Sequence, residues 1–239
     1  MSTTPPQSPS QPTTQAPPLA GLLLLLSVTT GLVDAISVLG LGKVFTANMT
    51  GNIVFLGFAA AGTPGFRVAP YLVAIVAFLV GALVAGRTGK AHAGRPLRRW
   101  LMIAATIEAV LLWIAAAIAI DFDVATQTPD LSVYAIIILT GLAMGFRNAT
   151  IRQLKVPDLT TTVLTLTLTG LAADSSLAGG ANINWRRRIG SVAAIFGGAA
   201  LGAVLVMRTG LTAPLILAGA LVLAGTAACA FHPGSARPA

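Results

Sequence analysis

The sequence predicts an all-α integral membrane protein, with six transmembrane helices plus two re-entrant half-helices arranged as two inverted repeats. Three observations lead to this fold class: sparse charge, six long apolar segments, and two short apolar segments that begin with polar residues. Only 9% of the 239 residues are charged and 55% are hydrophobic, whereas about 25% of residues are charged in a typical soluble domain. Charge this sparse indicates a chain that resides in lipid.

The long apolar segments set the domain organisation. They are residues 19–41, 69–86, 100–120, 131–146, 189–207 and 211–231. Most of them fit a hydrocarbon core of about 30 Å, which takes about 20 helical residues, and the fourth is somewhat short. We expect four parts: a disordered Pro-rich tail over 1–18, a membrane repeat over 19–120, a second over 121–232, and a short tail over 233–239.

Two shorter segments read NMTGNIVFLGFAAAG over 48–62 and DLTTTVLTLTLTGLA over 158–172. A helix of this length reaches about 22 Å, which is short for a span and fits a re-entrant half-helix. The second segment alternates Thr and Leu as a strand would. An open strand in lipid leaves its backbone groups unpaired, so we expect a helix there.

An internal repeat relates the two halves. At an offset of 110, Thr30-Gly31-Leu32 matches Thr140-Gly141-Leu142, and Asn48 and Thr50 match Asp158 and Thr160. At an offset of 121, Gly81-Ala82 and Arg87-Thr88-Gly89 match Gly202-Ala203 and Arg208-Thr209-Gly210. Each half therefore contains a helix, a short segment and two more helices.

Loop charge decides whether the short segments re-enter or cross. With re-entrant segments there are six spans, and twelve of the fifteen Lys and Arg residues lie in the cytoplasm, leaving outside only Lys43, Arg67 and Arg208. With full crossings the division is ten against five, so the six-span arrangement fits the positive-inside rule better. Three spans per half invert the second half relative to the first and place both termini in the cytoplasm.

In this arrangement two helix N-termini face each other near the membrane midplane, and each presents unpaired N–H groups and a partial positive charge. Such ends favour a small polar or anionic ligand. The candidate substrate-binding residues are Asn48, Thr50, Gly51, Asn52, Asp158, Thr160, Thr161, Thr162, Asn148 and Arg147. The alternative interpretation is that the short-segment residues are helix caps and packing contacts.

Two acids lie within apolar segments, Asp34 in the first and Glu108 in the third. Carboxyl groups inside a membrane are costly and usually face a cavity or a partner, so both are candidates for proton coupling. The alternative is a structural ion pair with Arg147, a residue that is also a candidate anion ligand. We expect no metal and no cofactor, because the chain has one cysteine, Cys229, and two histidines.

Two stretches, TTGLVDAISVLGLGKVFTANMTGN and GFRNATIRQLKVPDLTTTVLT, make the chain resemble the YoaK-like family of bacterial membrane proteins, a domain of unknown function. The resemblance covers nearly the whole chain after the tail and implies a polytopic inner-membrane protein. It implies no activity or substrate. The family commonly has Gln-Asn where this chain has Arg147-Asn148, which implies that an arginine at 147 is not obligatory.

The favoured function is a secondary transporter or permease for a small polar or anionic solute, with proton coupling through the buried acids as one mode. A channel, or a non-transporting sensor or scaffold, remains the alternative. We expect no enzyme, because no catalytic set occurs at the required spacing. The expected partners are the lipid bilayer, the solute and a second copy in a homodimer. Nucleic acid is not expected, and the expected location is the bacterial cytoplasmic (inner) membrane.

Overall fold

The computed structural model describes residues 17–92, 94, 96–154, 164–182 and 184–232, which are helical apart from turns and connections. The helices are α1 (Pro17–Gly40), α2 (Met49–Ala60), α3 (Val68–Ala91), α4 (Leu97–Ile118), α5 (Asp130–Gln153), α6 (Leu164–Ala173), α7 (Trp185–Thr209) and α8 (Thr212–Ala230). Short 3-10 turns follow α4 and α6, at Ala119–Asp121 and Ser176–Ala178. No strand occurs among these residues, so the all-α prediction is confirmed for the part described.

Six of the described helices, α1, α3, α4, α5, α7 and α8, are long and apolar enough to cross a membrane, which confirms the six long segments as helices. Two boundaries differ from the prediction. Helix α1 begins at Pro17, inside the expected tail, because proline fits the first turn of a helix. Helix α5 continues seven residues past 146, because its polar Arg147 and Thr150 are buried inside the protein rather than marking a membrane edge.

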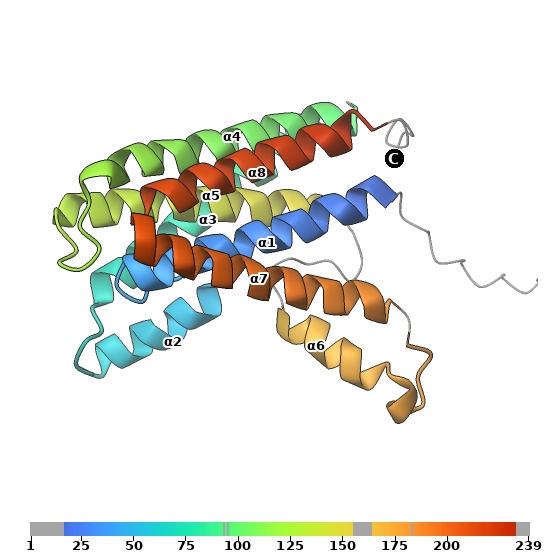
Figure 1. Cartoon of the computed structure of the whole chain (residues 1–239), viewed down its shortest axis with the longest axis horizontal. Helices are drawn as coiled ribbons and strands as arrows, with labels where there is room; N and C mark the ends of the chain where they lie inside the picture. Colours follow the sequence, from blue (N-terminus) through green and yellow to red (C-terminus); the bar gives the residue numbers. More distant parts are fainter. Residues whose placement is uncertain (1–16, 93, 95, 155–163, 183, 233–239) are drawn as a thin grey trace, which may run out of the picture.

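The helices form layers (Figure 1). Helices α1, α4, α5 and α8 pack together and are called the inner bundle below. Helix α3 packs along α5, and α7 packs along α1, so each outer helix lies on a helix from the other half of the chain. Short helix α2 packs on α3, and short helix α6 packs on α7. The inner bundle is therefore the part of the fold that can enclose a site.

Glycines let the outer helices approach the inner bundle closely. In the α1–α7 crossing, a methyl group added at Gly198 would collide with the carbonyl oxygen of Val28, and one added at Gly31 with that of Ile195. In the α3–α5 crossing, methyl groups at Gly81 and Gly145 would collide with the backbone of the facing helix in the same way. Both crossings therefore depend on backbone-to-backbone contact, which small residues permit.

The two short helices run outward from the middle of the molecule in the view of Figure 1, α2 toward the end where α1 stops and α6 toward the opposite end. Helix α2 confirms the short helix expected after Asn48, whose side chain accepts a hydrogen bond from the Gly51 N–H at 3.5 Å. Helix α6 confirms a helix over part of 158–172, and residues 158–163 lie outside the described residues.

Candidate functional site

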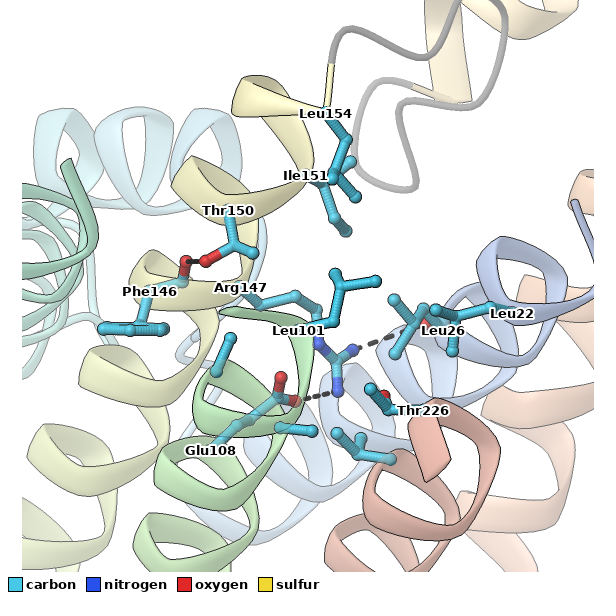
Figure 2. Close-up of a pocket in the computed structure, with 13 residues that line it drawn as sticks. Leu22, Leu26, Leu101, Glu108, Phe146, Arg147, Thr150, Ile151, Leu154 and Thr226 are labelled. Atoms are coloured by element: carbon cyan, nitrogen blue, oxygen red, sulfur yellow. Dashed lines mark hydrogen bonds and ion pairs between the residues drawn. The ribbon is translucent and has the colours of Figure 1, made fainter. Parts of the chain in front are cut away.

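A buried ion pair occupies the inner bundle (Figure 2). Arg147 of α5 and Glu108 of α4 are only 2% and 3% exposed, and Nη2 of the arginine donates to Oε1 of the glutamate. Nη1 of Arg147 turns toward α1, where it donates to the carbonyl oxygen of Leu26 at 3.3 Å and to Oγ1 of Thr30 at 3.1 Å. One guanidinium thus joins three helices that come from both halves of the chain.

The pair balances a large desolvation cost. A charge taken out of water is destabilising unless a partner of opposite sign and further hydrogen bonds compensate it. The Arg147 guanidinium uses both terminal nitrogens, while its Nε has no hydrogen-bond partner in the described part of the chain. The sequence offered this ion pair as the structural alternative for Glu108, and the contact is confirmed.

A small cavity of about 30 Å³ adjoins the pair, lined by residues of α1, α4, α5 and α8. Most of the lining is apolar, but Glu108, Arg147, Thr150 and Thr226 bring polar groups to it (Figure 2). A space of this size holds a water molecule or a small ion, which needs at least about 10–15 Å³. The inner bundle therefore has room for a small polar species beside its only described internal ion pair.

Asp34 lies on α1 one helical turn beyond Thr30, a rise of about 6 Å. The backbone N–H of Ala47 and the charge of Arg147 both act electrostatically on its carboxylate. Its Oδ1 is buried and has no hydrogen-bond partner among the described residues. Asp34 therefore lies between the Arg147–Glu108 pair and the segment that leads into α2.

The segment FTANMTGN, residues 45–52, is held together by hydrogen bonds between its own residues. The side-chain amide of Asn52, which is fully buried, accepts from the N–H of Phe45 at 2.9 Å and donates to the Phe45 carbonyl. The ring of Phe45 covers Gly51, where an added Cβ would lie 2.6 Å from the ring. The space beside Gly51, a candidate substrate-binding residue, is therefore filled by an aromatic side chain. The amide of Asn52 is engaged in holding the loop.

The other candidate residues lie in different surroundings. Asn48 and Thr50 are exposed at the start of α2, and the amide of Asn148 donates to the carbonyl of Met144 on its own helix, at 2.9 Å. Asp158, Thr160, Thr161 and Thr162 lie outside the described residues. The structure thus pairs Arg147 with Glu108 and places Asp34 one helical turn beyond Thr30, which Arg147 contacts. Ala47, two residues before α2, is the backbone group that acts on the Asp34 carboxylate.

Sequence reasoning missed Thr30, Thr46 and Thr226. Thr30 receives a hydrogen bond from Arg147, and Thr226 lines the cavity. The spacing of Thr30 and Asp34, four residues apart on one helix face, was a signal that could have found the first. Thr46 lies inside the FTANMTGN motif, is 0% exposed, and has a hydroxyl without a partner in the described structure.

Comparison with known proteins places the chain. It is 36% identical over 159 residues to UPF0700 transmembrane protein YoaK of Bacillus subtilis (strain 168), an alignment covering 65% of this chain and 66% of that protein. The chain thus spans just under two thirds of this relative's length. No solved structure matches. The family model described as "Protein of unknown function (DUF1275)" matches residues 22–228. With six membrane-length helices and a transmembrane relative, this multi-pass membrane protein belongs to the DUF1275 family.

Proposed function

We propose that the protein is a secondary transporter for a small polar or anionic solute, driven by an ion gradient. The observation that carries this proposal is the buried Arg147–Glu108 pair, which lines a cavity in the inner bundle, together with the carboxyl group of Asp34, on which the same guanidinium acts. Ionisable groups inside a membrane are expensive, and they commonly mark a substrate or ion pathway. One guanidinium and two ionised carboxyl groups carry a net charge of minus one. Binding of one further cation would neutralise them, as expected of a site that binds and releases a coupling ion.

The helix packing supports two inverted repeats. Gly202 of α7 faces the carbonyl of Leu32, and at the offsets found in the sequence its counterpart Gly81 faces the carbonyl of Leu142. Gly31 likewise faces Ile195, and its counterpart Gly141 faces Ala74. Helices α1 and α5 run in opposite directions in Figure 1, as inversion requires. Inverted repeats are a common architecture of secondary transporters.

The solute site would lie where the two short helices begin. Both α2 and α6 run outward from the middle of the molecule, which supports re-entrant half-helices rather than spans (Figure 1). Asn48 and Thr50, at the start of α2, would contact a polar or anionic solute. Asp158 and Thr160–Thr162 are proposed for the same role from the sequence repeat alone, since they lie outside the described residues. Arg98, Arg152 and Arg186 lie at one end of the bundle, which supports cytoplasmic termini in a bacterial inner membrane.

A carrier fits the interior better than a channel does. The cavity beside Arg147 is about 30 Å³, and a channel needs a continuous water-filled path across the bundle. Arg147, Glu108 and Thr30 instead bridge three helices across the space that such a path would use. A site enclosed by helices must open to one side at a time, which is how a carrier works.

Uptake into proteoliposomes tests the proposal. Vesicles containing the wild-type protein are given a panel of amino acids, carboxylates and inorganic anions under an inward proton or sodium gradient, and their contents are measured by mass spectrometry. We expect at least one solute to accumulate, Asp34→Asn to reduce accumulation at least tenfold, and Asp130→Asn, at an exposed acid, to leave it unchanged. If no solute accumulates in vesicles that hold folded protein, the proposal is wrong.

A further inference from the structure

We propose that Asp34 and Thr46 form a binding site for one monovalent cation of the size of sodium, where α1 meets the segment that leads into α2. The site rests on two buried oxygen atoms, Oδ1 of Asp34 and Oγ1 of Thr46, neither of which has a hydrogen-bond partner in the described structure. If the proposed function is correct, this cation is the one that drives transport, but binding itself does not depend on transport.

The backbone holds the two residues at one place. The backbone N–H of Ala47 acts on the Asp34 carboxylate, and Ala47 packs in the same buried cluster as Val33, the neighbour of Asp34 on α1. The peptide that joins Thr46 to Ala47 therefore lies near Asp34. Thr46 is 0% exposed, which excludes solvent as the usual partner of its hydroxyl. A buried hydroxyl or carboxylate oxygen without a partner is destabilising, and a native site of this kind calls for a ligand.

The local charge favours a cation. Glu108 occupies Nη2 of Arg147, and Nη1 is taken by Leu26 and Thr30, so the guanidinium does not close on Asp34. The charge of Arg147 and the backbone N–H of Ala47 act on the Asp34 carboxylate electrostatically, and no ion pair joins Asp34 to Arg147 in the described structure. Its own helix adds only the Ser37 hydroxyl, which donates to the Asp34 backbone carbonyl at 3.1 Å. One negative charge of the inner bundle remains to be balanced at this carboxylate.

The coordination chemistry favours sodium over a proton. A proton on Asp34 would neutralise the carboxyl group, but it would leave the Thr46 hydroxyl without a partner, because no hydrogen bond joins the two side chains. A hard cation accepts both oxygens as ligands and completes its shell with backbone carbonyls. Residues 41–48 are non-helical, so their carbonyls are not all used within a helix, as in the unwound segments that coordinate sodium in transporters.

Direct binding of ²²Na⁺ to the purified full-length protein in detergent, measured by scintillation proximity, tests the site. We expect saturable binding that excess unlabelled NaCl displaces and choline chloride does not. Asp34→Asn and Thr46→Val should each weaken binding at least tenfold, and Thr46→Ser should restore it to within about threefold of wild type, because the serine hydroxyl remains. The control is Thr29→Val, which removes a buried α1 hydroxyl that bonds the Leu26 carbonyl.

Size-exclusion profiles identify variants that fail to fold, and the Thr46→Val and Thr46→Ser pair still decides the question if Asp34→Asn is one of them. Absence of saturable ²²Na⁺ binding by folded wild-type protein would overturn the site, as would equal binding by wild type and Thr46→Val. A stability that responds to pH and not to sodium at constant ionic strength would show a proton site instead. Sodium binding without solute uptake would leave this site standing and overturn only the proposed transport.

Discussion

The α1–α7 and α3–α5 crossings are built alike, yet the polar groups beside them differ. Both crossings depend on glycines that face backbone carbonyls of the opposite helix. At the sequence offset of 110, however, Ser37 on α1 stands where α5 has Arg147, and Asp34 stands where α5 has Met144. The packing frame is therefore shared by both halves, whereas each ionisable group occurs in one half only. Ionisable residues can therefore differ between two similarly packed helix crossings without changing how the helices pack.

The largest expected loss of stability comes from breaking the buried Arg147–Glu108 ion pair. Replacing Arg147 by Met leaves Glu108 buried without a partner and should cost about 3–5 kcal/mol, as unpaired buried charges do. The double variant Glu108→Leu with Arg147→Met should recover most of that loss, because no charge remains buried. Thermal unfolding of the purified proteins in detergent measures both changes.

Ser37→Ala provides the matched change at the equivalent position of α1, where one hydroxyl hydrogen bond is lost. We expect this variant to lose about 1 kcal/mol. A similar loss of stability for Ser37→Ala and Arg147→Met would contradict the view that a buried charge occurs at Arg147 and not at the equivalent position of α1.

The glycine contacts that both crossings share predict equal losses of stability when either crossing is overpacked. Gly198→Ala and Gly145→Ala place methyl groups against the carbonyls of Val28 and Phe78 and should each cost about 1–3 kcal/mol through overpacking. Gly197→Ala on α7 and Gly86→Ala on α3, where an added methyl group meets nothing within 4 Å, are the controls on the outer helix of each crossing.

Melting temperatures of the four glycine variants give the comparison directly. Unequal losses at Gly198 and Gly145 would mean that only one crossing depends on close approach. If all four variants were as stable as the wild-type protein, neither helix crossing would depend on close backbone contact.

The last comparison concerns the loop before α2. Asn52→Ala removes the amide that binds both backbone groups of Phe45 and should cost about 1–2 kcal/mol. The residue at the matching offset is Thr162, whose side chain is shorter and carries one polar atom where the amide of Asn52 carries two. Limited proteolysis of the 41–48 segment reports loosening of the loop, and Thr50→Ala at the exposed start of α2 is the control.

Resistance of the loop in Asn52→Ala equal to that of wild type would show that Asn52 does not brace it. A loss of stability in Thr50→Ala of the same size would show that any polar change near the start of α2 has this effect.

Hydropathy and segment length predicted the six long helices and both short ones, because lipid allows few alternatives to a helix. The end of α5 was placed seven residues too early, since a sequence pattern treats an arginine as a membrane boundary and Arg147 instead pairs inside the bundle. The roles of Asn52 and Thr46 depend on how the chain turns between α1 and α2. Such a loop conformation leaves no periodic pattern in the sequence from which to predict it.

The exchange of outer helices between halves also bears on how the protein is made. Helix α1 finds its packing partner α7 only after residue 185 has been synthesised, and ribosomes add about 5–20 residues per second. About 145 residues separate the end of α1 from the start of α7, so for about 7–30 seconds the face of α1 that contains Gly31 has no α7 to pack against. A chain interrupted near its middle would keep that face open, so quality control has a distinct surface by which to recognise it.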